Sequence, residues 1–274
     1  MPNKANTLTD NFNDNVLDGT VGTRWFPFGQ VQEVNQRLEL RPPGTGVLYA
    51  GYISQAKYDL TTSFFQVEAV QVLRPVVGAL TYLKALLTQD TDELTLGTEN
   101  GVLACIQIVA GTQTSLARIP YEPASHRWWR LRENQGVVYW EASGDGKAWT
   151  VLFSKPNPFP PPSPGTSALS QVQAVLVAGT YLVVPSPGMA IFDSFNTPSA
   201  GLARRVEERR LSAREVREQA AALAASRPHP EHANNNDEVN YPDRPFIGNY
   251  SKGLKHDSVG DPDPVAYGSL LRAL

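Results

Sequence analysis

Apolar and polar residues alternate with a period of two along most of the first 197 residues, from Asp10 to Asn196. The alternating runs are short and end at Gly, Asp, Asn or Pro. Examples are RLEL from Arg37, FFQVEAVQV from Phe64, ACIQIVA from Ala104 and QVQAVLVAG from Gln171. A two-residue period places alternate side chains on opposite faces of a strand. About a dozen such runs, spaced by roughly ten residues with no helical stretch between them, predict a mostly β chain with a two-sheet antiparallel jelly-roll sandwich over residues 1–197.

The segment RWWRLRENQGVVYWEASGDGKAWTVL, which starts at Arg127, carries the clearest hairpin signal. Asp145 and Gly146 stand where a tight turn needs a positive φ, and apolar alternation flanks them on both sides. The alternation directs four residues inward, namely Trp129, Leu131, Trp140 and Trp149. It directs Trp128, Arg130 and Arg132 to the opposite face.

The hydrophobic period changes after Pro198. Residues 198–226 are rich in Ala, Arg and Glu, and Ser212 followed by Glu215 has the spacing of a capping box. An apolar stripe at helical spacing is formed by Leu211, Val216, Ala220 and Leu223. Residues 198–226 are therefore predicted to form a helical linker, with a break near Ser212 as an alternative.

Residues 227–274 form a third region with few aliphatic side chains and no period until its end. There, Asp263 and Pro264 supply an N-cap and a favourable first helical residue. We predict an extended arm followed by a short helix. Such an arm becomes ordered only on another surface, because it buries too little apolar area to offset its chain entropy.

We expect this arm to be a docking segment. The residues predicted to dock are Tyr250, Leu254, Tyr267, Leu270, Leu271 and Leu274. The favoured partner is another protein chain, and the alternatives are the chain's own sandwich and a second copy in a homo-oligomer.

Charge and composition exclude several classes of function. The formal net charge is −3, and no Lys/Arg cluster alternates with aromatic residues, so nucleic acid is not an expected partner. The single cysteine, Cys105, lies in an apolar run and is expected to be an inert core thiol. The N-terminal stretch has no apolar signal-peptide core, and no apolar span has membrane length. The sequence thus predicts a soluble protein, cytoplasmic by default.

Residues Asp10 to Thr197 resemble the concanavalin A-like jelly-roll sandwiches, which include laminin-G-like modules and domains attached to glycosidases. The resemblance lies in the order of its phrases: DNFNDNVLDGT at Asp10, RLEL at Arg37, FFQVEAVQV at Phe64, LLTQDTDELTLGTENG at Leu86, the hairpin segment at Arg127 and MAIFDSFNT at Met189. It implies a lectin-like role in which exposed aromatic rings contact a sugar. The candidates are Trp25, Tyr49, Tyr52, Tyr82, Trp128 and Tyr139, each with core or sheet-face packing as the alternative. We place the predicted ligand contacts at Trp128, Arg130, Arg132 and Tyr139.

Catalytic sandwiches of this architecture carry paired carboxylates on one strand, in a Glu-x-Asp-x-x-Glu-like run, because acid and base face the same glycosidic bond. The strand FFQVEAVQV offers Glu68 alone, and we expect Asp90, Asp92 and Glu93 at a solvated turn. We therefore predict no catalytic residue in this chain and no glycosidase activity.

No metal site is predicted. Calcium near Asp10 or Asp193 is a habit of concanavalin A-like proteins, but no ligand cluster in the sequence supports it. The tail offers one set of potential ligands, whose spacing fits no standard zinc pattern: His229, Glu231, His232, Asp237 and Glu238.

About the last fifty residues resemble the arm that precedes the helical core in vanadium-dependent haloperoxidase-like proteins of the phosphatidic-acid-phosphatase superfamily. The matching positions are Asn236–Glu238, Tyr241, Pro242, Ile247–Leu254, His256, Asp257, Gly260, Asp263, Pro264, Ala266, Tyr267 and Leu270–Leu274. Asn235 replaces a glycine of the family pattern and Lys255 replaces a proline. The resemblance implies that the vanadate-binding residues would lie beyond Leu274. No cofactor is then expected in this chain, and vanadate would belong to a separate catalytic domain.

Three functional interpretations remain open. The first is a non-catalytic, lectin-like binding or targeting module of bacterial type, joined to the leading arm of a haloperoxidase-like enzyme. The second is a subunit or fragment of a split or multichain vanadium-dependent haloperoxidase or acid phosphatase. The third is a structural assembly subunit that docks through its tail. In each case the arm contacts another chain or a downstream catalytic domain, and the first interpretation adds a glycan.

Overall fold

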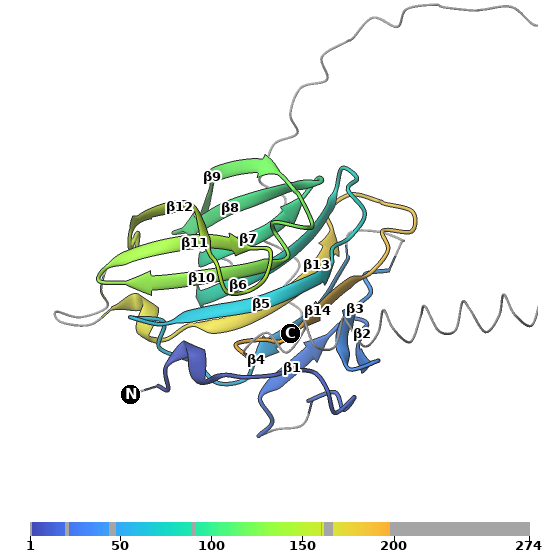
Figure 1. Cartoon of the computed structure of the whole chain (residues 1–274), viewed down its shortest axis with the longest axis horizontal. Coiled ribbons are helices and arrows are strands. Elements are labelled where there is room, and N and C mark those ends of the chain that lie inside the picture. The colour runs from blue at the N-terminus through green and yellow to red at the C-terminus, as the bar shows by residue number, and fades with distance from the viewer. Residues whose placement is uncertain are drawn as a thin grey trace, which may run out of the picture. The chain divides into compact units, whose positions relative to one another are not determined.

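The computed structural model describes residues 2–19, 22–43, 48–88, 91–159, 161 and 167–197. Within these residues the chain forms two antiparallel sheets of seven strands each, stacked as a sandwich (Figure 1). The predicted mostly β, two-sheet fold is confirmed. The predicted helical linker (198–226) and arm (227–274) lie outside the described residues.

The strands of each sheet come from distant parts of the sequence. Sheet A contains, in spatial order, β1 (Trp25–Phe28), β4 (Leu48–Ser54), β13 (Gln173–Thr180), β6 (Ala79–Thr88), β7 (Asp92–Glu99), β8 (Val102–Val109) and β9 (Thr112–Pro120). Sheet B contains β12 (Thr150–Pro156), β11 (Val137–Ser143), β10 (Trp128–Asn134), β5 (Phe64–Gln71), β14 (Ala190–Asp193), β3 (Arg37–Leu40) and β2 (Val31–Val34). Two short 3₁₀ helices, η1 (Ala5–Thr7) and η2 (Ala168–Ser170), complete the described elements. Because β13 pairs with β4 and β14 with β3, each sheet needs residues from both ends of the sandwich sequence.

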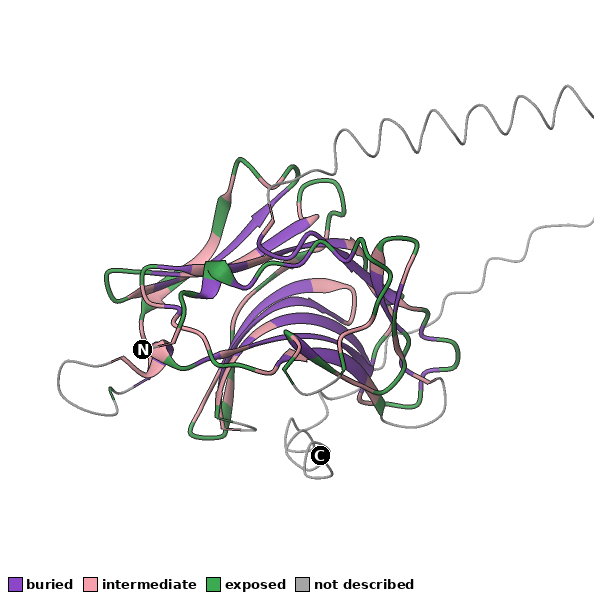
Figure 2. Cartoon of the chain, turned by 90° about the horizontal axis from the view of Figure 1, so that it is seen from below, coloured by how far each residue is buried: buried purple, intermediate pink, exposed green. Residues whose placement is uncertain are grey.

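The hydrophobic core lies between the two sheets, where buried residues follow the strands of both layers (Figure 2). Trp129, Leu131 and Trp140 point into this core, as the alternation predicts. The indole Nε1 of Trp140 on β11 donates a hydrogen bond of 2.9 Å to the backbone oxygen of Thr95 on β7. This bond links the two sheets and satisfies the polar atom of an otherwise apolar side chain.

The turn between β11 and β12 departs from the prediction at one residue. Gly146 has a φ of 73°, as this turn requires. However, the prediction that Trp149 points inward is wrong, because the guanidinium of Arg130 lies 4.0 Å from the centre of the Trp149 ring on the outer face of sheet B. The physical reason is that the turn folds back over this face: a Cβ at Gly146 would lie 2.9 Å from the ring of Trp128.

The two ends of the sandwich sequence meet. Asp10 and Phe195 form an isolated antiparallel bridge. The side-chain Nδ2 of Asn196 donates to the backbone oxygens of Ala5 at 2.9 Å and Leu8 at 2.8 Å. These buried bonds fix η1 against the end of β14.

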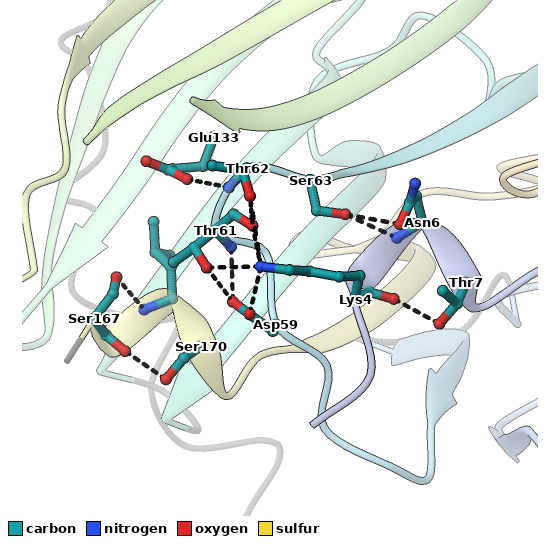
Figure 3. A network of polar contacts seen from close by, with 11 residues as sticks. Lys4, Asn6, Thr7, Asp59, Thr61, Thr62, Ser63, Glu133, Ser167 and Ser170 are labelled. Atoms are coloured by element: carbon teal, nitrogen blue, oxygen red, sulfur yellow. Dashed lines mark hydrogen bonds and ion pairs between the residues drawn. The ribbon is translucent and has the colours of Figure 1, made fainter. Parts of the chain in front are cut away.

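A polar network holds the first residues of the chain to the segment before β5 (Figure 3). Lys4 Nζ donates to Asp59 Oδ2 and to the backbone oxygen of Thr61, both at 2.7 Å. In the same network the backbone N–H of Thr62 donates to Glu133 Oε2 on β10 at 2.5 Å. The N-terminal segment is thereby connected to sheet B.

Cys105 on β8 is buried in the sandwich core. Burial raises the pKa of its thiol to about 12, so the thiol stays protonated and unreactive at neutral pH, as predicted. Among the described residues, no helix has the length and apolarity needed to cross a membrane.

Candidate functional site

Strand pairing in sheet A lines up a row of residues on the outer face of the sheet, away from the sandwich core. Val177 on β13 is opposite Gly51 on β4 and Tyr82 on β6, and the pairing continues in both directions. The whole row reads Phe28, Gly51, Val177, Tyr82, Gly97, Ala104 and Arg118. Each of the two aromatic residues of this row, Phe28 and Tyr82, therefore stands beside a glycine, Gly51 and Gly97.

Two aromatic rings of this face lie across glycines of the neighbouring strand. A Cβ at Gly51 would be 2.2 Å from Cζ of Phe28, and a Cβ at Gly179 would be 2.0 Å from Cδ1 of Tyr49. Only glycine leaves room for a ring at these positions, which explains why isolated glycines occur inside β4 and β13. Phe28 and Tyr49 are half-buried, so part of each ring rests on the sheet and part stays exposed.

Polar groups lie on the same sheet as these rings. The hydroxyl of Tyr181 donates to Oδ1 of Asn100 at 2.7 Å. At the other side of the face, the guanidinium of Arg118 donates to Glu99 Oε2 at 2.8 Å and is itself exposed. Rings that offer a partly exposed surface beside hydrogen-bonding amides and charges form the kind of surface on which sugars bind.

Two carboxylates of β7 also face outward, but their arrangement does not suit glycoside hydrolysis. Glu93 and Glu99 are six residues apart on one strand, which at about 3.3 Å per residue separates them by roughly 20 Å. A glycosidase pair stands roughly 5–9.5 Å apart. Glu93 is bound by Lys84 Nζ at 2.8 and 3.0 Å, and Glu99 by Arg118.

The position of Glu93 also corrects a prediction. Glu93 is not at a solvated turn: it lies within β7, is buried and accepts a further bond of 3.0 Å from the hydroxyl of Thr95. Asp92 begins the same strand, and Asp90 lies outside the described residues. Asp92 and Glu93 therefore belong to the strand and not to the turn, because they directly precede the alternating residues LTL of β7.

Three of the four predicted ligand contacts lie together on the outer face of sheet B. Glu141 accepts hydrogen bonds from Arg130 Nε at 2.6 Å and from Arg132 at 2.9 and 3.1 Å. The guanidinium of Arg132 lies 4.0 Å from the ring centre of Tyr139. Burial opposes the ionisation of Glu141, but the hydrogen bonds from the two arginines hold its pKa below the ordinary value. The cluster is a charge network on the outer face of sheet B in which two guanidinium groups share one carboxylate.

Trp128 does not have the exposure expected of a sugar contact. Its ring is only 1% exposed, because the turn at Gly146 covers it. Trp25 and Tyr52, two further aromatic candidates, are fully buried in the core. Tyr49 keeps an exposed part, and it belongs to the outer face of sheet A.

The potential calcium residue Asp10 lies in an acidic cluster at the edge of the sandwich. It accepts hydrogen bonds from Trp25 Nε1 at 3.0 Å and from the backbone N–H of Phe12 at 2.9 Å. Arg24 forms ion pairs with Asp10 at 3.3 Å and with Asp18 at 3.4 Å. Among the described residues, no group of three His, Cys, Asp or Glu side chains is arranged to hold a metal ion.

Sequence reasoning missed the outer face of sheet A as a site. A local signal was present, since glycines inside predicted strands mark places where another group approaches the backbone closely. What was missing was the register: Tyr49 meets Gly179 only because β4 pairs with β13, more than a hundred residues later in the sequence.

Comparisons with known proteins support the fold but identify no family. No protein-family model and no curated protein matches this chain. An uncharacterized protein from Mycobacterium paratuberculosis is 16% identical with a TM-score of 0.50, over 68% of this chain and 97% of that one. A glycosyl hydrolase family protein from Mycobacterium fortuitum is 13% identical with a TM-score of 0.52, over 68% of this chain and 96% of that one. At such identities the likeness supports the jelly-roll sandwich, while the haloperoxidase-like arm stays a prediction.

Proposed function

We propose that this chain is a non-catalytic carbohydrate-binding module that holds a glycan on the outer face of sheet A. The observation that carries the proposal is the placement of the Phe28 and Tyr49 rings across Gly51 and Gly179. The apolar faces of sugar rings stack on such aromatic surfaces, and nearby polar groups select their hydroxyls. The fold is shared with the glycosyl hydrolase family protein from Mycobacterium fortuitum, which supports a carbohydrate-related role.

Binding without hydrolysis fits the charges of this face. The outward carboxylates of β7 are too far apart to act on one glycosidic bond, and each is held by a cation. Asn100, bound to the hydroxyl of Tyr181, and Arg118, exposed beside Glu99, instead supply further hydrogen-bonding groups. We assign these groups to sugar hydroxyls.

Calorimetric titration with a panel of oligosaccharides, chosen by a glycan array, tests this proposal. Tyr49→Ala is expected to weaken binding by at least roughly tenfold, since stacking on one aromatic ring contributes on the order of 1 kcal/mol or more. The matched control is Tyr139→Ala, which removes a half-buried tyrosine from the outer face of sheet B. Unchanged binding by Tyr49→Ala overturns the site on sheet A. Loss of binding by Tyr139→Ala instead places the glycan at the predicted cluster of Arg130 and Arg132.

The arm gives a second candidate function. Its sequence resemblance from Asn236 to Leu274 favours docking to a vanadium-dependent haloperoxidase-like catalytic domain, as part of the same enzyme or as a separate subunit. The sandwich would then bring that catalytic domain to a glycan-bearing surface. Co-purification of the full chain with such a domain tests this idea, and an arm carrying Tyr250→Ala and Leu254→Ala should lose the association.

A further inference from the structure

Exposed apolar side chains gather at one end of sheet A. Seven large apolar side chains of the described residues are exposed, and the four at this end are Leu48 (36% exposed), Val77 (68%), Leu182 (42%) and Val183 (70%). These four, the end patch, lie at the start of β4, in the β5–β6 loop (residues 72–78) and in the β13–β14 loop (residues 181–189). The other three are scattered over the N-terminal segment, β1 and β12. Single exposed apolar residues are ordinary, whereas a group of them marks a contact surface.

Strand pairing and hydrogen bonding bring the parts of the end patch together. Thr180, the last residue of β13, pairs with Leu48 on one side and with the first residue of β6 on the other. The backbone N–H of Tyr181 donates to the backbone oxygen of Gly78 at 2.8 Å. A Cβ at Gly78 would lie 2.8 Å from Cβ of Leu182. The two loops therefore form one surface at this end of the sandwich (Figure 1).

Several backbone N–H groups of the two loops are paired or missing. Arg74 N–H donates to the oxygen of Pro187 at 3.1 Å, and Val76 N–H to the oxygen of Arg74 at 2.8 Å. Gly78 N–H donates to Oδ1 of Asn100 at 2.8 Å. The residues without an N–H are Pro75, Pro185 and Pro187. A backbone donor that loses water without gaining a partner is destabilising in lipid, and these loops reduce that penalty.

The charge of the two loops fits a phospholipid headgroup. Arg74 is the only charged residue in 72–78 and 181–189, and it is exposed. Its Cγ lies 3.5 Å from the position of a Cβ at Gly188, so its aliphatic stem rests against the second loop. A guanidinium beside apolar tips can bind a lipid phosphate while its stem stays on the apolar side.

A protein partner fits the end patch less well. The residues that anchor protein interfaces are mostly Trp, Tyr and Arg, and Leu and Val are under-represented among them. The end patch contains only Leu and Val, and the adjacent Tyr181 is half-buried with its hydroxyl bound to Asn100 at 2.7 Å. Aliphatic tips without hydrogen-bonding groups match the boundary between the headgroups and the acyl chains of a bilayer.

We infer that the end patch docks this chain on the surface of a phospholipid bilayer. Val77, Leu182 and Val183 enter the boundary between headgroups and acyl chains, and Arg74 lies at the level of the phosphates. The contact is peripheral and reversible, since its strength scales with the small apolar area that it buries. Because the formal net charge of the chain is −3, apolar insertion drives the contact and electrostatic attraction does not. The inference does not depend on the proposed glycan site.

Flotation of the full chain with phosphatidylcholine vesicles, with and without phosphatidylglycerol, tests the docking. Val77→Asp with Val183→Asp is expected to lower the lipid partition coefficient at least roughly tenfold, because two apolar tips become charged. The matched control is Val16→Asp with Val151→Asp, which alters two exposed valines elsewhere (64% and 47%) and should bind as the wild type does. All four side chains are exposed, so both variants should keep the unfolding midpoint of the wild type.

Three results of this experiment would overturn the inference. They are no vesicle binding by the wild type, an equal loss of binding in both double variants, and release of the wild type from vesicles at high salt, which would assign the binding to charge. Self-association of the wild type in analytical ultracentrifugation, if Val77→Asp with Val183→Asp abolishes it and no vesicles are bound, would assign the end patch to a contact between protein chains.

A fluorescent label measures insertion without adding a charge to the end patch. Cys105, the only cysteine, is buried, so Val183→Cys can be labelled at a single position with an environment-sensitive dye. The emission of this dye should shift to the blue on vesicles, and the emission of the same dye at Val151→Cys should not. An equal response at both positions, or no response at residue 183, would contradict insertion of the end patch.

Discussion

The hydroxyl of Tyr52 on β4 donates a hydrogen bond of 3.1 Å to Glu33 Oε1 on β2, across the edge where the two sheets meet. Both side chains are buried, and the second carboxyl oxygen of Glu33 has no hydrogen-bond donor. Burial, followed by the negative charge of Asp10 and the neighbouring carboxyl of Asp14, raises the pKa of Glu33 to about 8. Glu33 is thus protonated in the folded protein at neutral pH.

This protonation predicts that stability falls as pH rises. The ordinary pKa of the side chain is 4.5, so between about pH 4.5 and 8 the folded state holds a proton that the unfolded state has lost. The contribution of Glu33 to stability is therefore complete below about pH 4.5 and is lost progressively up to about pH 8. Glu33→Gln should flatten this dependence and raise stability at pH 8. Urea unfolding at several pH values checks it, with exposed Glu122→Gln as the control. If the stability of the wild type and of Glu33→Gln changes with pH in the same way, the raised pKa of Glu33 is refuted.

The close fit of Tyr49 over Gly179 predicts a specific double-mutant effect. Gly179→Ala places a Cβ within 2.0 Å of the Tyr49 ring and should destabilise the fold by about 1–3 kcal/mol, or displace the ring. Combining Gly179→Ala with Tyr49→Ala should restore most of the lost stability, because the clash is removed. Denaturant unfolding of the single and double variants measures the coupling. Additive effects would mean that the ring does not lie over the glycine.

The two attachments of the N-terminal segment should differ in strength. Asn196→Ala removes two buried hydrogen bonds to Ala5 and Leu8 and one from the backbone N–H of Gln66, and should cost about 2–4 kcal/mol. Lys4→Met removes an ion pair whose lysine is half-exposed, and should cost less than about 1 kcal/mol. Thermal and denaturant unfolding compare the two variants. An equal loss in both would contradict this ranking.

The chain alone should catalyse none of the reactions suggested by its resemblances. We expect no hydrolysis of oligosaccharides, because Glu93 and Glu99 are too far apart and are held by Lys84 and Arg118. We also expect no peroxide-dependent halogenation with added vanadate and no phosphatase activity. Product analysis on the purified full chain checks all three. Turnover that survives further purification and is abolished by Glu93→Gln or Glu99→Gln would refute the non-catalytic assignment.

Features that depend on neighbouring residues can be predicted from the sequence alone. A period of two fixes which side chains of a strand share a face, so Trp129, Leu131 and Trp140 were placed in the core correctly. The turn at Gly146 followed equally from local backbone geometry. The mostly β fold follows from the sum of these local patterns.

The surfaces that those side chains contact depend on long-range packing. Alternation cannot tell that the turn after β11 folds back over Trp128, or that Glu93 finds Lys84 on the next strand. Nor can it tell that Tyr49 lies across Gly179, because strand order and register arise from pairings between segments far apart in the chain. The two-residue period shows which side chains share a face of a strand. Long-range packing alone determines which residues cover that face.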